Sequence, residues 1–255
     1  MRRLHKDAQI RQKNSPRSSQ EERKWISWDE YLNVVQNLKK KVQENLSLNA
    51  QKGGKIPLST KRRIATEYQY YLILAFMACV PDRQRTFREL VVGKTFIRDN
   101  NLRCWTICHG PEDYKTGKTY GQRPPLILSA DLTEVIDDYL LNWRPFLLKA
   151  TEQNVEDKFF LQARTGKAMT SDSIYNIVSR CCFKQTGKKT NPHLLRDMIV
   201  THVRSSPNTS EQQLEALALY MGHSVEMQRN SYDRRTMEQK VAPAVELLQS
   251  VNKSQ

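Results

Sequence analysis

Apolar residues recur at three- and four-residue steps along most of the chain, and this spacing predicts helices. The first pattern follows Ser27, a residue type that caps helices, and its apolar positions are Tyr31, Val34, Val35, Leu38 and Val42. Further helices are predicted at residues 64–79, 132–149, 171–183, 192–205, 211–221 and 236–251, with Ser171, Ser210 and Thr236 as caps. Pro81 is expected to end the second helix.

The pattern changes between residues 90 and 128. Residues 102–108 and 125–128 have the composition of strands, and Thr116-Gly117 is a turn signal between them. Residues 50–63, which contain glycine and proline, are predicted to be a basic loop. The expected fold class is therefore α+β: a mostly helical domain with a small antiparallel sheet.

The first 24 residues differ in composition from the rest. They are polar and charged, so residues 1–24 are predicted to be a flexible basic tail or interdomain linker. Residues 25–255 are expected to form the folded domain. No apolar run approaches the length of a membrane span and no signal peptide is visible, so we expect an intracellular, soluble protein.

Charge and cysteine content narrow the function further. The formal net charge is +14, which indicates a polyanionic partner, most simply nucleic acid. The chain has five cysteines, an odd number in a chain with no secretory signal, so disulfides are not expected. Cys104, Cys108 and His109 suggest a zinc site, but no second ligand pair follows at finger-like spacing. Buried thiols are the favoured interpretation.

Two Gly-Lys-Thr triplets, at residues 93–95 and 117–119, resemble part of a phosphate-binding loop. The required upstream glycine is missing in each case, because Arg88 and Glu112 stand at that position. ATP use is therefore not expected. No cluster of acidic residues suggests a two-metal nuclease site, so the sequence predicts no cofactor and no metal.

The most informative segments lie in the C-terminal third. His193 and Arg196 are three residues apart near the start of a predicted helix, where backbone N–H groups favour a phosphate. Gly222 can end a later helix, and His223 follows it. Tyr232 comes nine residues after His223.

Together these segments resemble the tyrosine recombinase (phage integrase) family, over about residues 25–251. The His193-x-x-Arg196 and Gly222-His223-Ser224 boxes, with Tyr232, are similar to the last two boxes of that family. Arg83, with Leu90 seven residues on, resembles its first arginine, and Arg85 is a rival for that place. Lys115 resembles its hairpin lysine, with Lys118 as a rival. The chain departs from the family pattern at Asp82, Asp197, Arg229 and Asn230.

The resemblance implies the catalytic-domain fold and the cutting and rejoining of double-stranded DNA. It implies that Tyr232 attacks phosphorus and becomes linked to the 3′ phosphate while Arg83 and Arg196 neutralise the phosphate. His193 and His223 would move protons, and Lys115 would protonate the departing 5′ oxygen. It also implies a homo-tetramer on paired sites, with a monomer in isolation. Only about 24 residues precede the first predicted helix, too few for the family's N-terminal clamp domain. We therefore expect either part of a longer protein or an unusually short member of the family, and we favour the first.

Three alternatives remain open. A type IB topoisomerase uses the same tyrosine chemistry, although those enzymes usually have lysine in place of His193. A catalytically inactive DNA-binding protein is the second, and a helix-turn-helix regulator is the third.

The last predicted helix has an apolar face whose partner the sequence does not identify. Its apolar positions are Val241, Ala244, Val245, Leu248 and Val251, and this face is expected to dock either on its own domain or on a neighbouring protomer.

Overall fold

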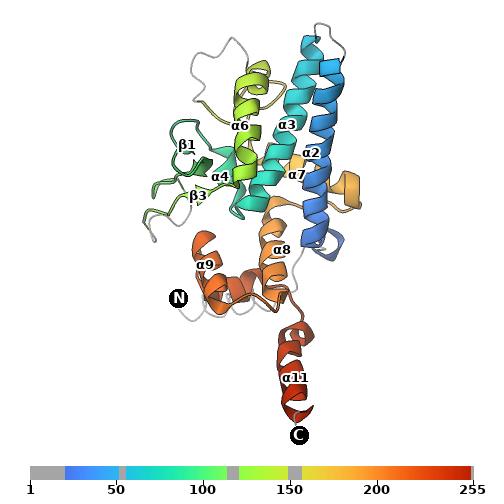
Figure 1. Cartoon of the computed structure of the whole chain (residues 1–255), viewed down its shortest axis with the longest axis vertical. Helices are drawn as coiled ribbons and strands as arrows, with labels where there is room; N and C mark the ends of the chain where they lie inside the picture. The colour runs from blue at the N-terminus through green and yellow to red at the C-terminus, as the bar shows by residue number, and fades with distance from the viewer. Residues whose placement is uncertain (1–20, 52–55, 114–120, 149–156, 254–255) are drawn as a thin grey trace, which may run out of the picture.

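The computed structural model describes residues 21–51, 56–113, 121–148 and 157–253. They form a mostly helical body with one small sheet (Figure 1), which confirms the expected fold class. The α-helices are α2 (Trp28–Gln51), α3 (Leu58–Cys79), α4 (Gln84–Arg88), α6 (Thr133–Asp138), α7 (Ser171–Thr186), α8 (Pro192–Ser205), α9 (Glu211–Tyr220), α10 (Val225–Met227) and α11 (Met237–Lys253). Short 3-10 and π-helical turns are η1 (Glu21–Arg23), η2 (Ala130–Leu132), η3 (Tyr139–Trp143), η4 (Arg144–Leu147) and η5 (Gln228–Tyr232).

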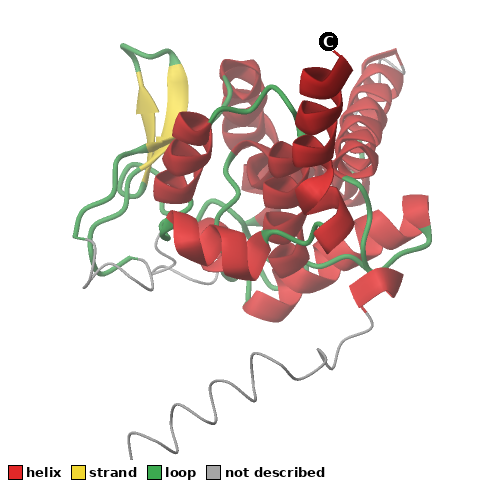
Figure 2. Cartoon of the chain, turned by 90° about the horizontal axis from the view of Figure 1, so that it is seen from below, coloured by secondary structure: helices red, strands yellow, loops and turns green. Residues whose placement is uncertain are grey.

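The sheet is antiparallel, with strand order β1-β2-β3. Its strands are β1 (Phe96–Asp99), β2 (Cys104–Ile107) and β3 (Leu126–Ile127). The central strand β2 lies within the strand predicted at residues 102–108 and is buried at every position. Strand β1 was not predicted, because its four residues include an arginine and an aspartate and show no clear alternation. Figure 2 shows the sheet at one edge of the helices.

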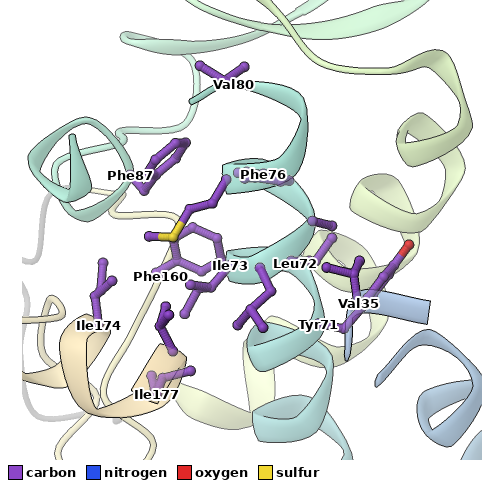
Figure 3. Close-up of a cluster of buried hydrophobic side chains, with 14 of the residues drawn as sticks. Val35, Tyr71, Leu72, Ile73, Phe76, Val80, Phe87, Phe160, Ile174 and Ile177 are labelled. Carbon is purple, nitrogen blue, oxygen red and sulfur yellow. The ribbon is translucent and has the colours of Figure 1, made fainter. Parts of the chain in front are cut away.

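The core is built around α3, which lies beside α2 in Figure 1. Half of the residues of α3 are buried, on every side of its C-terminal part. Phe76 contacts the rings of Phe96, Phe159 and Phe160 at centroid distances of 5.5–5.6 Å. Figure 3 shows side chains from α2, α3, α4 and α7 meeting there. This core fixes the end of α3, from which the chain enters the candidate site.

Several predicted caps are confirmed and one is displaced. Ser27 accepts a hydrogen bond from the Glu30 N–H at 3.0 Å, and Ser210 forms a reciprocal capping box with Gln213. Thr236 accepts one from the Gln239 N–H at 3.2 Å. The cap of α7 is Thr170 rather than Ser171; both are hydroxyl residues, so the sequence alone does not separate them.

Two predicted boundaries are wrong. The predicted loop at 50–63 is shorter, because α2 continues to Gln51 and α3 begins directly after Pro57. A proline is tolerated at the start of a helix, and the polar first turns of α3 conceal its periodicity. The predicted helix at 132–149 is divided into α6, η3 and η4. Pro145 lacks an N–H and breaks the ladder there.

Residues 21–24, which the sequence places in the tail, contain η1 and contact the body. The Lys24 carbonyl accepts a 2.7 Å hydrogen bond from the Thr190 hydroxyl. Residues 1–20 lie outside the described part of the chain. Within the described residues, no helix is both long enough and apolar enough to cross a membrane.

Candidate active site

The N-terminus of α8 presents two of the predicted residues. The Asn191 side chain caps the helix by accepting hydrogen bonds from the N–H groups of His193, at 3.0 Å, and Leu194, at 3.1 Å. Pro192 occupies the first turn, where its missing N–H costs nothing. His193 is exposed at this end, whereas Arg196, one turn on, is only 2% exposed.

A tight turn after α9 delivers His223 and Tyr232. Gly222, which the sequence predicts to end this helix, has φ +69°, a left-handed conformation that favours glycine. Ser224 then caps α10, accepting from the Met227 N–H at 3.1 Å, and the π-helical turn η5 ends at Tyr232. The rings of His223 and Tyr232 are stacked, with centroids 4.6 Å apart and planes 23° apart. Both side chains are buried, at 3% and 6% exposure.

Arg196 connects these two parts of the site. Its guanidinium carbon lies 5.1 Å from the centre of the Tyr232 ring, and its Nη2 donates to the Met221 carbonyl at 3.2 Å. The Nε and Nη1 atoms are buried and have no hydrogen-bond partner among the described residues. An arginine buried with two free donors is costly unless an anion completes it. The site is therefore suited to a phosphate.

Arg83 joins the site from the turn before α4. It stands immediately before α4, in an extended backbone conformation. It lines a pocket of about 510 Å³ together with His193 and Arg196. The other lining residues are Gln84, Arg85, Arg88, Tyr175, Asn191 and Pro192. The structure thus brings the first predicted arginine to the same place as the His193-x-x-Arg196 pair.

The structure distinguishes Arg83 from its rival. Arg85 forms an exposed ion pair with Glu89 at 2.8 Å. Arg83 is half-buried, and its charge contributes to the lowered pKa values of Arg196 and His223. Both arginines line the pocket, and Arg83 is the less exposed of the two.

The electrostatics keep His223 neutral. Burial, together with the positive charges of Arg196 and Arg83, lowers the pKa of His223 to about 4. Burial also lowers the pKa of Arg196 below its ordinary value, although Tyr232 and Asp82 oppose that effect. A neutral imidazole against the tyrosine ring is in the form that accepts a proton.

A buried ion pair beneath the site was missed by the sequence reasoning. Asp82 accepts hydrogen bonds from Arg123 Nη1 at 2.7 Å, the Arg83 N–H at 2.7 Å and the Thr86 hydroxyl at 2.9 Å. Burial alone would raise the pKa of Asp82, but the charges of Arg123 and Arg196 hold it below its ordinary value. From the sequence alone, Asp82 is recognisable only as a departure from the family pattern.

Arg123 also contacts the turn that precedes His223. Its Nη2 donates to the Tyr220 carbonyl, and its guanidinium lies next to Gly222. Arg123 therefore joins the segment before β3 both to the turn before α4 and to the turn after α9. Nothing in the local sequence Gln122-Arg-Pro-Pro marks this arginine, because the link is made only by the fold.

One predicted residue cannot be placed. Lys115 and its rival Lys118 lie at residues 114–120, outside the described part of the chain. Five of the six predicted residues therefore converge on one site. Of the suggested zinc residues, Cys104 and His109 are buried, and the described residues contain no group of three side chains suited to a metal ion.

Comparison with known proteins supports the fold. The crystal structure of XerA recombinase matches with a TM-score of 0.52 and 16% sequence identity, covering 87% of this chain and 64% of that chain. At this identity the likeness shows a shared fold. The chain spans less than two thirds of the length of XerA recombinase. No protein-family model and no curated protein matches the sequence.

Proposed function

We propose that this protein is a tyrosine recombinase that cuts and rejoins double-stranded DNA through a 3′-phosphotyrosine bond. The observation that carries the proposal is the meeting of Tyr232, Arg196 and His223 in one buried site, with Arg83 on the adjoining pocket wall. The likeness to XerA recombinase, whose name describes a recombinase, supports it at the level of the fold.

The arginines account for phosphate binding. A phosphodiester repels an approaching nucleophile, and its negative charge grows in the transition state. Arg83 and Arg196 neutralise that charge on the non-bridging oxygens, and a guanidinium can bind two oxygens at once. The unpartnered Nε and Nη1 of Arg196 fit this role. Its hydrogen bond to the Met221 carbonyl keeps the side chain in place.

Tyr232 supplies the nucleophile. Its phenolic oxygen forms a bond to phosphorus while the bond from phosphorus to the 5′ oxygen breaks. The phenolic proton passes to His223, whose neutral ring stacks on the Tyr232 ring and can accept it. His193, at the exposed edge of the pocket, binds the phosphate and shares in proton transfer.

Lys115 protonates the 5′ oxygen as it leaves, and rejoining reverses the steps. The phosphotyrosine keeps the energy of the phosphodiester bond, so the reaction needs neither ATP nor a metal ion. The excess of basic residues matches a DNA partner. Recombination exchanges four strands, so the active assembly is a homo-tetramer on two duplexes, and the isolated chain is a monomer.

The proposal is tested by covalent trapping on a nicked suicide duplex, from which the short 5′ strand diffuses away after cleavage. Wild-type protein should form a protein–DNA adduct that survives denaturing electrophoresis. Tyr232→Phe should form none while binding DNA nearly normally, and Tyr220→Phe, the nearest tyrosine in sequence, should react normally. Binding without any adduct from the wild type would favour the inactive DNA-binding alternative.

A further inference from the structure

One side of α8 binds the segment that carries Tyr232. The residues involved are Asp197, Thr201 and Arg204, which stand one turn apart on the helix and so share a face. Each contacts the chain between Gln228 and Arg235 through an ion pair or hydrogen bond. Arg196, which faces the tyrosine ring, directly precedes the first of these residues.

The contacts closest to the tyrosine are those of Asp197 and Thr201. The Asp197 carboxylate, whose side chain is 1% exposed, accepts two hydrogen bonds from the Arg234 guanidinium, with the one from Nε at 3.0 Å. The Thr201 hydroxyl accepts from the Arg234 N–H at 3.0 Å and donates to the Tyr232 carbonyl at 3.3 Å. The backbone on the C-terminal side of Tyr232 is therefore attached at two points.

Arg204 holds the remainder of the segment. Its guanidinium donates to the Gln228 side-chain oxygen at 3.1 and 2.8 Å. Its own carbonyl accepts a 2.6 Å hydrogen bond from Arg235 Nη1. The ring of Tyr232 fills the space between these anchors, where it packs with Val200 and Met221. Both ends of the π-helical turn are thus joined to one rigid helix.

We infer that Asp197 is a positioning residue, which with Arg234 and Thr201 holds Tyr232 in line with a phosphate bound by Arg196 of the same chain. This inference rests on the proposed function. The physical reason is that Arg196 and the anchors of the nucleophile belong to consecutive turns of α8, so their separation is fixed by helix geometry. A displacement of the nucleophile of about 1 Å is enough to cost on the order of 100-fold in rate.

A purely structural role would have a different signature. If Asp197 and Arg234 only stabilised the fold, their loss would weaken DNA binding and cleavage together. If they position the nucleophile, cleavage by bound protein falls while binding stays. The arrangement also requires that Tyr232 attacks the phosphate held by its own chain, since the anchors and Arg196 are on one helix.

The experiment measures single-turnover cleavage of a saturating suicide duplex, with DNA affinity measured in parallel. Asp197→Asn and Arg234→Gln should each slow cleavage at least about 100-fold while the Kd changes by less than about threefold. Arg234→Lys should recover part of the rate, because it restores the charge without the two-bond geometry. Arg229→Ala is the matched control: Arg229 lies in η5, close to Arg234 in the sequence, but pairs with Glu211, on α9, at 2.9 Å. It should cleave normally.

Two further readouts do not depend on the cleavage rate of one variant. Hydrogen exchange should speed up in residues 228–235 of Asp197→Asn but stay unchanged in α9, which keeps the measurement informative even if a harsher variant fails to fold. A mixture of Arg196→Ala and Tyr232→Phe proteins should yield no adduct, because neither chain holds a complete site.

Wild-type cleavage rates in Asp197→Asn and Arg234→Gln would overturn the inference, as would adduct formation by the mixture. Equal losses of binding and cleavage would also overturn it, in favour of a structural role. These outcomes leave the proposed function standing, because wild-type protein still forms the adduct. Failure of the wild type to form one overturns the proposed function itself.

Discussion

The guanidinium carbon of Arg196 lies 5.1 Å from the centre of the Tyr232 ring, and both side chains are buried. The two residues come from different elements, α8 and η5, so their contact depends on the turn at Gly222 and on the anchors along α8. A cation over the face of an aromatic ring is attractive. This contact holds the proposed nucleophile beside the proposed phosphate site.

Loss of either arginine of the site should slow cleavage much more than loss of their neighbour Arg85. Arg83→Ala and Arg196→Ala should each lower the cleavage rate of bound DNA by at least about 100-fold, the scale on which one charge-stabilising donor acts. Arg85→Ala should lower it less than about 10-fold, because Arg85 is exposed and already paired with Glu89. The measurement is single-turnover cleavage at saturating protein. A severe effect at Arg85 with a mild one at Arg83 would move the first box by two residues.

Lys115 and Lys118 can be separated by changing the leaving group. A general acid is needed because an alkoxide leaves poorly, whereas a thiolate leaves without protonation. Lys115→Ala should therefore be slow on ordinary DNA and fast again on a duplex with sulfur at the 5′ bridging position. Lys118→Ala should be little affected on either substrate. Rescue of Lys118→Ala instead would assign the acid three residues further along.

His223 should make stability depend on pH. Its pKa is about 4 in the folded protein and near 6.5 when unfolded, so the unfolded chain binds more protons between these values. The contribution of neutral His223 to the free energy of unfolding is fully present above about pH 6.5. It is lost as the pH falls toward about 4, by on the order of 3 kcal/mol in total. Urea unfolding across this range tests it.

The comparison for that test is the His223→Gln variant, which keeps a polar side chain but does not titrate. The difference between wild type and variant isolates His223 from His109, whose pKa is also lowered by burial. Stability curves that remain parallel from pH 7 to pH 4 would contradict a buried neutral His223.

Replacing only one residue of the Asp82–Arg123 pair should lower the stability of the fold. Both side chains are almost fully buried, at 2% and 5% exposure, so removing one leaves an uncompensated charge. Arg123→Met and Asp82→Asn should each lower the free energy of unfolding by about 3 kcal/mol, and the double variant should lose less than the sum. Urea unfolding of the four proteins measures this coupling. Additive losses would show that the two side chains act independently.

Much of this site follows from the sequence, for a physical reason. His193 and Arg196 are related by helix geometry, and His223 and Tyr232 by one tight turn and one short helix, so their spacing encodes their positions. Asp82 and Arg123 are related only by tertiary structure, and no local pattern can report a buried pair between distant segments. The same limit applies to the fold. Long amphipathic helices such as α8 were predicted, whereas β1 depends on pairing with β2.

The C-terminal helix presents an exposed apolar face. Helix α11 extends away from the body (Figure 1), and every residue of it whose exposure is described is exposed. Val241, Val245 and Leu248 are 47%, 49% and 61% exposed. This does not match the expectation that the helix docks on its own domain. It favours the alternative that the apolar face binds a neighbouring protomer in the proposed tetramer.

Deleting residues 237–255 should therefore leave a folded protein that binds a single DNA site but does not assemble on paired sites. A subtler pair of variants tests the face itself. Val241→Glu with Leu248→Glu places charges on the apolar side, whereas Gln239→Glu with Ser250→Glu places the same charge on the opposite side of the helix. Gel-shift and sedimentation measurements should show loss of the higher-order complex only for the first pair. Normal assembly by the deletion variant would rule out the exchanged helix, and a deletion variant that unfolds would indicate that α11 docks on its own chain.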